Sequence, residues 1–212
     1  MNENAHMAAE AYDLVAGRYH ELFHNEMREK EYDRNLLDGL ASRFKAGSLL
    51  LDAGCGPSAH IGRYVADKGL AVAGVDISER CITLARQYNP AMAFLQADIA
   101  GLPFRPASFE GVISYYSIMH TPKSVLLCTF REFARVLKRG GLLLIAVKAG
   151  AHDAIDTELL GVRTEIHVSL FSLQEIRAWF VEAGFALEFI EMRNPYDFEI
   201  NNDRIFAIGR KL

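Results

Sequence analysis

The sequence predicts an α/β protein built on a doubly wound, mostly parallel sheet. From residue 48 onward, short apolar strands alternate with amphipathic helices, the pattern of a parallel sheet covered on both faces. The first of these strands is followed by a glycine-rich turn. The last two apolar stretches, 185–192 and 204–210, have no helical pattern between them and predict a C-terminal antiparallel hairpin.

Length and composition indicate one globular domain. The chain has 212 residues, of which 50% are hydrophobic and 24% charged. A net charge of -4 gives no basic surface for nucleic acid or an anionic membrane, and no apolar run reaches the roughly 20 residues of a membrane span. Three cysteines without metal-ligand spacing and an N-terminus without signal-peptide features predict a cytoplasmic protein. We expect it to be a monomer or a homodimer.

Two helical stretches precede the first strand. Apolar residues recur at helical spacing over 7–24 and 28–45, and Tyr12 and Tyr19 lie one heptad apart. We expect residues 1–45 to form a helical lid on a core of residues 46–212, within a single domain of residues 1–212. The two tyrosines either cover a ligand or pack on the helix face.

The core is predicted element by element from its apolar runs and its helix caps. Ser78 is a plausible N-cap, and Ser172 and Glu175 have the spacing of a capping box. Strands are expected at 48–52, 70–76, 92–97, 110–115, 142–148, 185–192 and 204–210, and helices at 59–68, 79–88, 124–138 and 173–183.

Residues 149–170 interrupt the alternation. This segment contains His152, Arg163 and His167, and we expect an irregular loop on the substrate side of the sheet. The two histidines either face the substrate or are ordinary surface residues. Arg163 either binds a substrate carboxylate or pairs with Glu165.

Acidic residues end three successive strands. Asp52 ends the first, just before Gly54 and Gly56, and Asp76 and Asp98 end the second and third. Ligands of doubly wound sheets bind outside the carboxyl ends of the strands, so these groups should line one edge. Each has a role if the ligand is an adenosine bearing an amino acid.

Those roles follow from the hydrogen-bonding capacity of carboxylates. Asp76 accepts from both ribose hydroxyls, and Asp98 accepts from the adenine amine while Ile99 packs on the base. Asp52 places a negative charge where the ligand's cationic groups lie. A pyrophosphate would be repelled by Asp52, which argues against a nicotinamide dinucleotide, the main alternative that the glycines allow.

These motifs resemble those of the class I S-adenosylmethionine-dependent methyltransferases. The similar stretches are Asp52-Ala-Gly-Cys-Gly56, Val75-Asp76-Ile77-Ser78 and Ala97-Asp98-Ile99, within a resemblance that covers about residues 45–210. The resemblance implies a Rossmann-like, seven-stranded sheet with one antiparallel strand, and S-adenosylmethionine as cofactor, with S-adenosylhomocysteine as product. It implies that the cofactor is bound by Tyr12, Tyr19, Asp52, Gly54, Cys55, Gly56, Asp76, Ile77, Asp98, Ile99 and Ser114.

Catalytic candidates follow the fourth strand and the interrupting loop. His120 is the best candidate for a base, although it is equally compatible with capping the next helix or contacting the cofactor. The ring of Tyr115 can face the sulfonium, and His167 can approach the acceptor from the loop.

The acceptor is expected to be a small molecule methylated by direct displacement at an oxygen or nitrogen. The chain has neither a second acidic pair that would hold a metal nor an Asn/Asp-Pro-Pro-Tyr tetrad after the fourth strand. Two alternatives stay open. One is a protein that binds the cofactor without methylating anything, as a sensor or assembly partner, and the other is a nicotinamide-dependent oxidoreductase.

Overall fold

The computed structural model describes residues 3–212. The helices are α1 (Glu3–Phe23), α2 (Glu31–Ala41), α3 (His60–Ala66), α4 (Glu79–Tyr88), α5 (Leu126–Val136) and α6 (Leu173–Glu182). The strands are β1 (Leu49–Ala53), β2 (Ala71–Asp76), β3 (Ala93–Gln96), β4 (Phe109–Tyr115), β5 (Leu137–Lys148), β6 (Asp153–Leu159), β7 (Val162–Ser169), β8 (Phe185–Arg193) and β9 (Arg204–Lys211). Short 3-10 turns lie at Glu26–Arg28, Ile118–His120 and Lys123–Val125.

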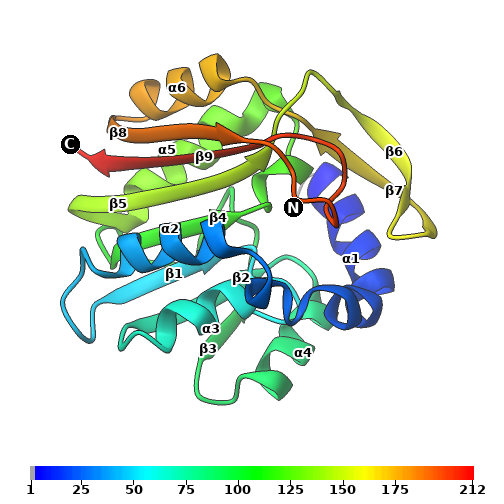
Figure 1. Cartoon of the computed structure of the whole chain (residues 1–212), viewed down its shortest axis with the longest axis horizontal. Coiled ribbons are helices and arrows are strands. Elements are labelled where there is room, and N and C mark those ends of the chain that lie inside the picture. The colour runs from blue at the N-terminus through cyan, green and yellow to red at the C-terminus, as the bar shows by residue number, and fades with distance from the viewer. Residues whose placement is uncertain (1–2) are drawn as a thin grey trace.

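Seven strands form one sheet in the order β3-β2-β1-β4-β5-β9-β8, which confirms the predicted fold class. β9 runs antiparallel to both of its neighbours, β5 and β8, so the C-terminal hairpin is present as expected. Helices α2 and α3 cover one face and α5 and α6 the other (Figure 1). The central strands β1 and β4 are therefore buried on both faces, and the carboxyl ends of the strands are the expected place for a ligand.

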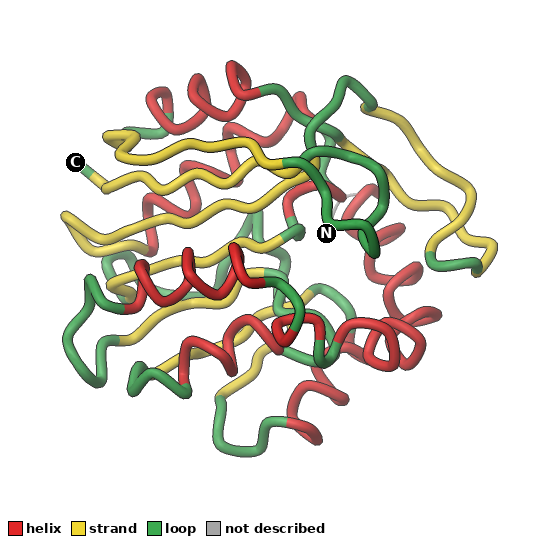
Figure 2. Tube along the Cα trace, viewed as in Figure 1, coloured by secondary structure: helices red, strands yellow, loops and turns green. Residues whose placement is uncertain are grey.

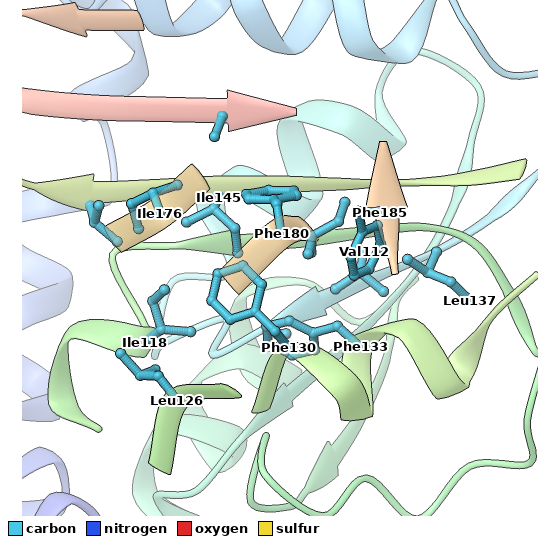
Figure 3. Close-up of a cluster of buried hydrophobic side chains, with 14 of the residues drawn as sticks. Val112, Ile118, Leu126, Phe130, Phe133, Leu137, Ile145, Ile176, Phe180 and Phe185 are labelled. Carbon is cyan, nitrogen blue, oxygen red and sulfur yellow. The ribbon is translucent and has the colours of Figure 1, made fainter. Parts of the chain in front are cut away.

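Aromatic side chains fill the core between the sheet and α5 and α6 (Figure 3). The ring of Phe130 lies 5.3 Å from that of Phe180 and 6.0 Å from that of Trp179, measured between centroids. Val112 and Ile145 reach this layer from the sheet. Because α5 packs here, the segment that joins it to β4 is held at the carboxyl edge of the sheet.

Residues 149–170 form a two-stranded hairpin, β6 and β7, and the prediction of an irregular loop was wrong. Its turn is Leu160-Gly161, both with positive φ, and Leu is an unusual residue at such a position. The hairpin stands beside α1, outside the same end of the main sheet (Figure 2). Together they cover the edge where the predicted ligand site lies.

One helix boundary also differs from the prediction. Helix α5 ends at Val136, and Lys138 and Arg139 already belong to β5, which contains a bulge at Gly140 with φ +76°. The two caps expected from sequence are present: Ser78 accepts a hydrogen bond from the amide of Cys81, and Ser172 and Glu175 form a full capping box.

Replacing Phe130 by alanine should lower the free energy of unfolding by about 3–5 kcal/mol, because it empties a fully buried aromatic site. The matched control is Phe198→Ala, since Phe198 is 55% exposed and should change stability by about 0.5 kcal/mol or less. Urea unfolding at pH 7.5 measures both. Equal losses in the two variants would contradict the described core.

Candidate active site

The glycine turn after β1 is bound to the end of β2. The amides of Gly54 and Cys55 both donate to the carbonyl of Val75, at 2.8 and 2.9 Å, and the amide of Gly56 donates to the Asp76 carboxylate at 2.8 Å. Gly54 has φ +82°, and a Cβ on it would lie 2.2 Å from the Cβ of Ser117. No residue other than glycine fits at this position without displacing the segment after β4.

A cavity of about 300 Å³ opens at this edge of the sheet. It is enclosed by the glycine turn, the ends of β2 to β4, the segment after β4 and one face of α1. The residues predicted for the site that line it are Tyr12, Tyr19, Gly54, Gly56, Asp76, Ile77, Asp98, Ile99, Tyr115 and His120. Concave, largely apolar cavities with a few convergent polar groups are typical small-molecule sites.

Asp76 is the buried carboxylate of the cavity. Its two oxygens accept from the amides of Gly56 and Ser78, at 2.8 and 3.0 Å. Burial raises its pKa to about 6, and the backbone amides oppose this rise. A carboxylate has about four lone-pair positions, so Asp76 can still accept two hydroxyl groups from a ligand.

Asp98, Ile77 and Ile99 lie around the outer part of the cavity. Asp98 is half-buried and uses one oxygen to accept from the amide of Ala100 at 2.9 Å. Its other oxygen is available to a ligand, and the two isoleucines offer apolar surface for a flat ring.

His120 is held in one tautomer by two hydrogen bonds. Its Nδ1 lies 3.0 Å from the carbonyl of His167, which can only accept, so Nδ1 carries the proton. Its Nε2 therefore accepts from the Tyr12 hydroxyl, at 2.9 Å. Burial lowers the pKa of His120 to about 4, and Lys148 adds to this effect. The imidazole is neutral near pH 7.

Four of the predicted site residues do not line the cavity. Asp52 is buried beneath α3, where it accepts from the amide of Gly62 at 3.0 Å. Cys55 packs against Ala59, Ile82 and Phe94. Neither side chain lines the cavity.

The other two residues, Ser114 and His167, do not line the cavity but contact residues that do. Ser114 donates to the Ser117 hydroxyl at 2.6 Å, because Ser117 gives its own proton to the carbonyl of Ala53. His167 is buried on β7, with Nε2 2.8 Å from Asp153, and its backbone carbonyl fixes His120. His152 lies on the exposed hairpin and pairs with Asp156 at 2.9 Å, outside the cavity.

Arg163 and Glu165 are also exposed on the hairpin and do not line the cavity, so Arg163 is not placed to bind a ligand there. Sequence reasoning missed several wall residues, including Asn4, Ala8 and Ser117. Asn4, Ala8 and Tyr12 follow each other at intervals of four, which is the helical spacing that could have identified this face of α1.

Among residues 3–212, no group of three or more His, Cys, Asp and Glu side chains could hold a metal ion. No helix in the same range combines the length and the apolar character that crossing a bilayer requires.

Comparisons with known proteins agree with this geometry. Residues 51–145 match the model of a family described as a methyltransferase domain. A malonyl-[acyl-carrier protein] O-methyltransferase from Enterobacter lignolyticus is 29% identical, over 84% of this chain and 75% of the relative. A 27-O-demethylrifamycin SV methyltransferase from Amycolatopsis mediterranei is 32% identical, over 79% of this chain and 65% of the relative.

A solved structure of an S-adenosylmethionine-dependent methyltransferase from Methanosarcina mazei superposes with a TM-score of 0.73 at 18% identity, covering 82% of this chain and 96% of that one. The family match and the shared fold together indicate a methyltransferase. Class I S-adenosylmethionine-dependent methyltransferases, whose fold this chain shares, use S-adenosylmethionine as their methyl donor.

The cavity fits that cofactor. Gly54 leaves room that a Cβ would fill, Asp76 retains free lone pairs for a ribose, and Ile77 and Ile99 provide apolar walls. The carboxylate of Asp52, by contrast, lies under α3 and does not line the cavity.

Replacing Asp52 by asparagine should stabilise the protein at pH 8. Burial raises the pKa of Asp52 to about 7, far above its value of 3.8 in an unfolded chain. The folded state therefore holds more protons than the unfolded state between these values, and wild-type stability falls as pH rises from about 4 to about 7. Asparagine still accepts from Gly62 and does not ionise, so the gain should be about 3 kcal/mol at pH 8 and less than half of that at pH 5.

Urea unfolding at the two pH values measures this difference, with Asp197→Asn as the exposed control. A variant that loses more stability at pH 8 than at pH 5 would show that Asp52 is ionised and compensated in the folded protein.

Proposed function

We propose that this chain transfers a methyl group from S-adenosylmethionine to an oxygen or nitrogen atom of a small metabolite or natural product. The observation that supports it best is that one cavity contains both the residues suited to the cofactor and a neutral histidine, His120. The relatives named above are O-methyltransferases, which favours oxygen as the acceptor atom.

In this proposal Asp76 accepts from the ribose hydroxyls and Asp98 from the adenine amine, with the base between Ile77 and Ile99. The turn at Gly54 and Gly56 leaves room for the amino-acid part. When bound, the cofactor supplies a sulfonium methyl group with its own leaving group, so the protein's work is alignment and exclusion of water. α1 excludes water, since Tyr12 and Tyr19 line the cavity.

His120 is the proposed base where the acceptor must lose a proton. Its Nε2 lone pair is available because burial keeps the ring neutral, and an acceptor hydroxyl would take the place of the Tyr12 hydroxyl. Tyr115 contributes its ring alone, because its hydroxyl donates to Asp33 at 2.6 Å. His167 is a positioning residue that holds His120 through its carbonyl.

The cofactor assignment is tested by thermal unfolding with S-adenosylhomocysteine, NADH or NADPH. A ligand at a hundredfold excess over its Kd stabilises the folded state by about 2.7 kcal/mol, which is roughly 5–10 °C for a chain of this size. We expect a shift with S-adenosylhomocysteine alone. A shift with a nicotinamide nucleotide alone would support the oxidoreductase alternative instead.

Asp76→Asn should weaken S-adenosylhomocysteine binding by about tenfold or more, since an amide offers the ribose only one accepting oxygen. Asp197→Asn, a change on an exposed loop, is the matched control and should leave Kd unchanged. Titration calorimetry measures both. Unchanged binding in the Asp76 variant would remove that residue from the cofactor site.

His120→Ala separates a base from a structural histidine, once an acceptor turns over. We expect kcat to fall by more than about tenfold, with unchanged binding of S-adenosylhomocysteine. A fall within about threefold, less than roughly 1 kcal/mol of barrier, would exclude His120 as the base. Absence of turnover with every acceptor, despite tight cofactor binding, would favour the sensor alternative.

A further inference from the structure

A buried network of charges joins the β8–β9 loop to the start of α2. The carboxylate of Glu199 lies 3.0 Å from Lys30, 2.8 Å from Arg193 and 3.7 Å from Arg204. Although burial works against it, hydrogen bonds from Arg193, the amide of Tyr196 and Lys30 lower the pKa of Glu199 to about 2. The carboxylate of Glu199 thus forms ion pairs with three cations.

The other carboxylates of the network are also engaged. Glu26 lies 2.9 Å from Lys30 and 2.7 Å from His60, and Asp33 lies 2.9 Å from Arg193 and accepts from Tyr115. Each of these carboxylates already has a basic partner, so none of them is free to pair with a further cation.

That further cation is Lys148. No hydrogen bond or ion pair joins its ammonium group to any other part of residues 3–212. Lys148 is half-buried and lies directly opposite Arg204 in the register of β5 and β9, so two like charges share one face. Burial, then the charges of Arg204 and Lys30, lowers the pKa of Lys148 to about 8.

Lys148 does not line the cavity itself, but it is the last residue of β5 and lies at the same end of the sheet. β5 ends one strand away from β4, and Ala146, two residues earlier on the same face, pairs with Tyr115 of the cavity wall. The charge of Lys148 also contributes to the low pKa of His120, which faces the cavity. The positive charge of Lys148 therefore acts on the proposed base.

Tyr116 supplies a second unsatisfied group, next to Lys30 and Arg204 of the same charge network. Its ring lines the cavity and lies 5.6 Å from Lys30 Nζ and 5.9 Å from Arg204 Cζ, measured to the ring centroid. Its hydroxyl is buried and has no hydrogen-bond partner within residues 3–212. Its φ of +55° is costly for a tyrosine, and strain of this kind is typical of functional positions.

We propose that the acceptor carries a carboxylate, held by the ammonium of Lys148 beside the hydroxyl of Tyr116. This inference rests on the proposed function and names the substrate class of the same site. A carboxylate supplies the missing countercharge for Lys148 and an acceptor for the Tyr116 hydroxyl, and it leaves the paired carboxylates undisturbed. Lys148 is then the residue that selects acids over their neutral analogues.

The test is binding of carboxylates to protein saturated with S-adenosylhomocysteine. The probes are benzoate, octanoate and glutarate, each beside its carboxamide, with Kd measured by ligand-observed NMR. We expect at least one acid to bind about tenfold or more tightly than its amide. Lys148→Met should abolish this preference, and Lys148→Arg should restore it.

Lys148→Met leaves no carboxylate unpaired and removes a repulsion from Arg204, so the variant should fold. Lys45→Met, an exposed site before β1 at the opposite end of the sheet, is the matched control. All variants should bind S-adenosylhomocysteine as the wild type does. The carboxylate proposal is overturned if none of the three acids binds, or if the preference for the acid survives Lys148→Met. Loss of S-adenosylhomocysteine binding by the wild type would instead overturn the proposed function.

Discussion

The contact between the glycine turn and the end of β2 is the constraint on which the site depends. Three successive amides, from Gly54 to Gly56, donate to the carbonyl of Val75 and the carboxylate of Asp76. This fixes the distance between two strand ends, and it needs a residue without Cβ at Gly54 because Ser117 lies against it. The same close approach brings the segment after β4, with His120, to the cavity. The residues proposed to bind the cofactor and the proposed base therefore line one cavity because this turn is tight.

The two elements that cover the cavity, α1 and the β6–β7 hairpin, are both hydrogen-bonded to His120. α1 reaches the site by the hydrogen bond from Tyr12 to His120, and the β6–β7 hairpin reaches it by the carbonyl of His167. Opening either element would break a hydrogen bond to the same imidazole. In the proposed mechanism, an acceptor that takes the place of the Tyr12 hydroxyl would remove one contact that holds α1 against His120.

Much of the fold was predictable because its signals are local. Alternating strands and helices, the caps at Ser78 and Ser172 and the missing helix before β9 all gave the correct elements. The β6–β7 hairpin was missed because its Leu160-Gly161 turn lacks the usual Asn or Asp and its strands are largely exposed. Which strand-end residues face the cavity was only partly predictable, since a turn can direct its neighbours either way, as Asp52 shows.

The charge network lies beyond sequence reasoning for a different reason. Lys30, Lys148 and Arg204 are distant in sequence, and only the pairing of β5 with β9 brings two of them together. Only the folded structure shows that Lys148 has no ion-pair or hydrogen-bond partner for its ammonium group within residues 3–212.

A crystal structure of the protein with S-adenosylhomocysteine tests the central claim most directly. The account predicts that the ribose hydroxyls lie within hydrogen-bond distance of Asp76, with the adenine between Ile77 and Ile99. It also predicts that the sulfur faces the space lined by Tyr12, Tyr116 and His120. A nucleoside bound elsewhere, or one that leaves Asp76 without a ligand contact, would contradict the site described here.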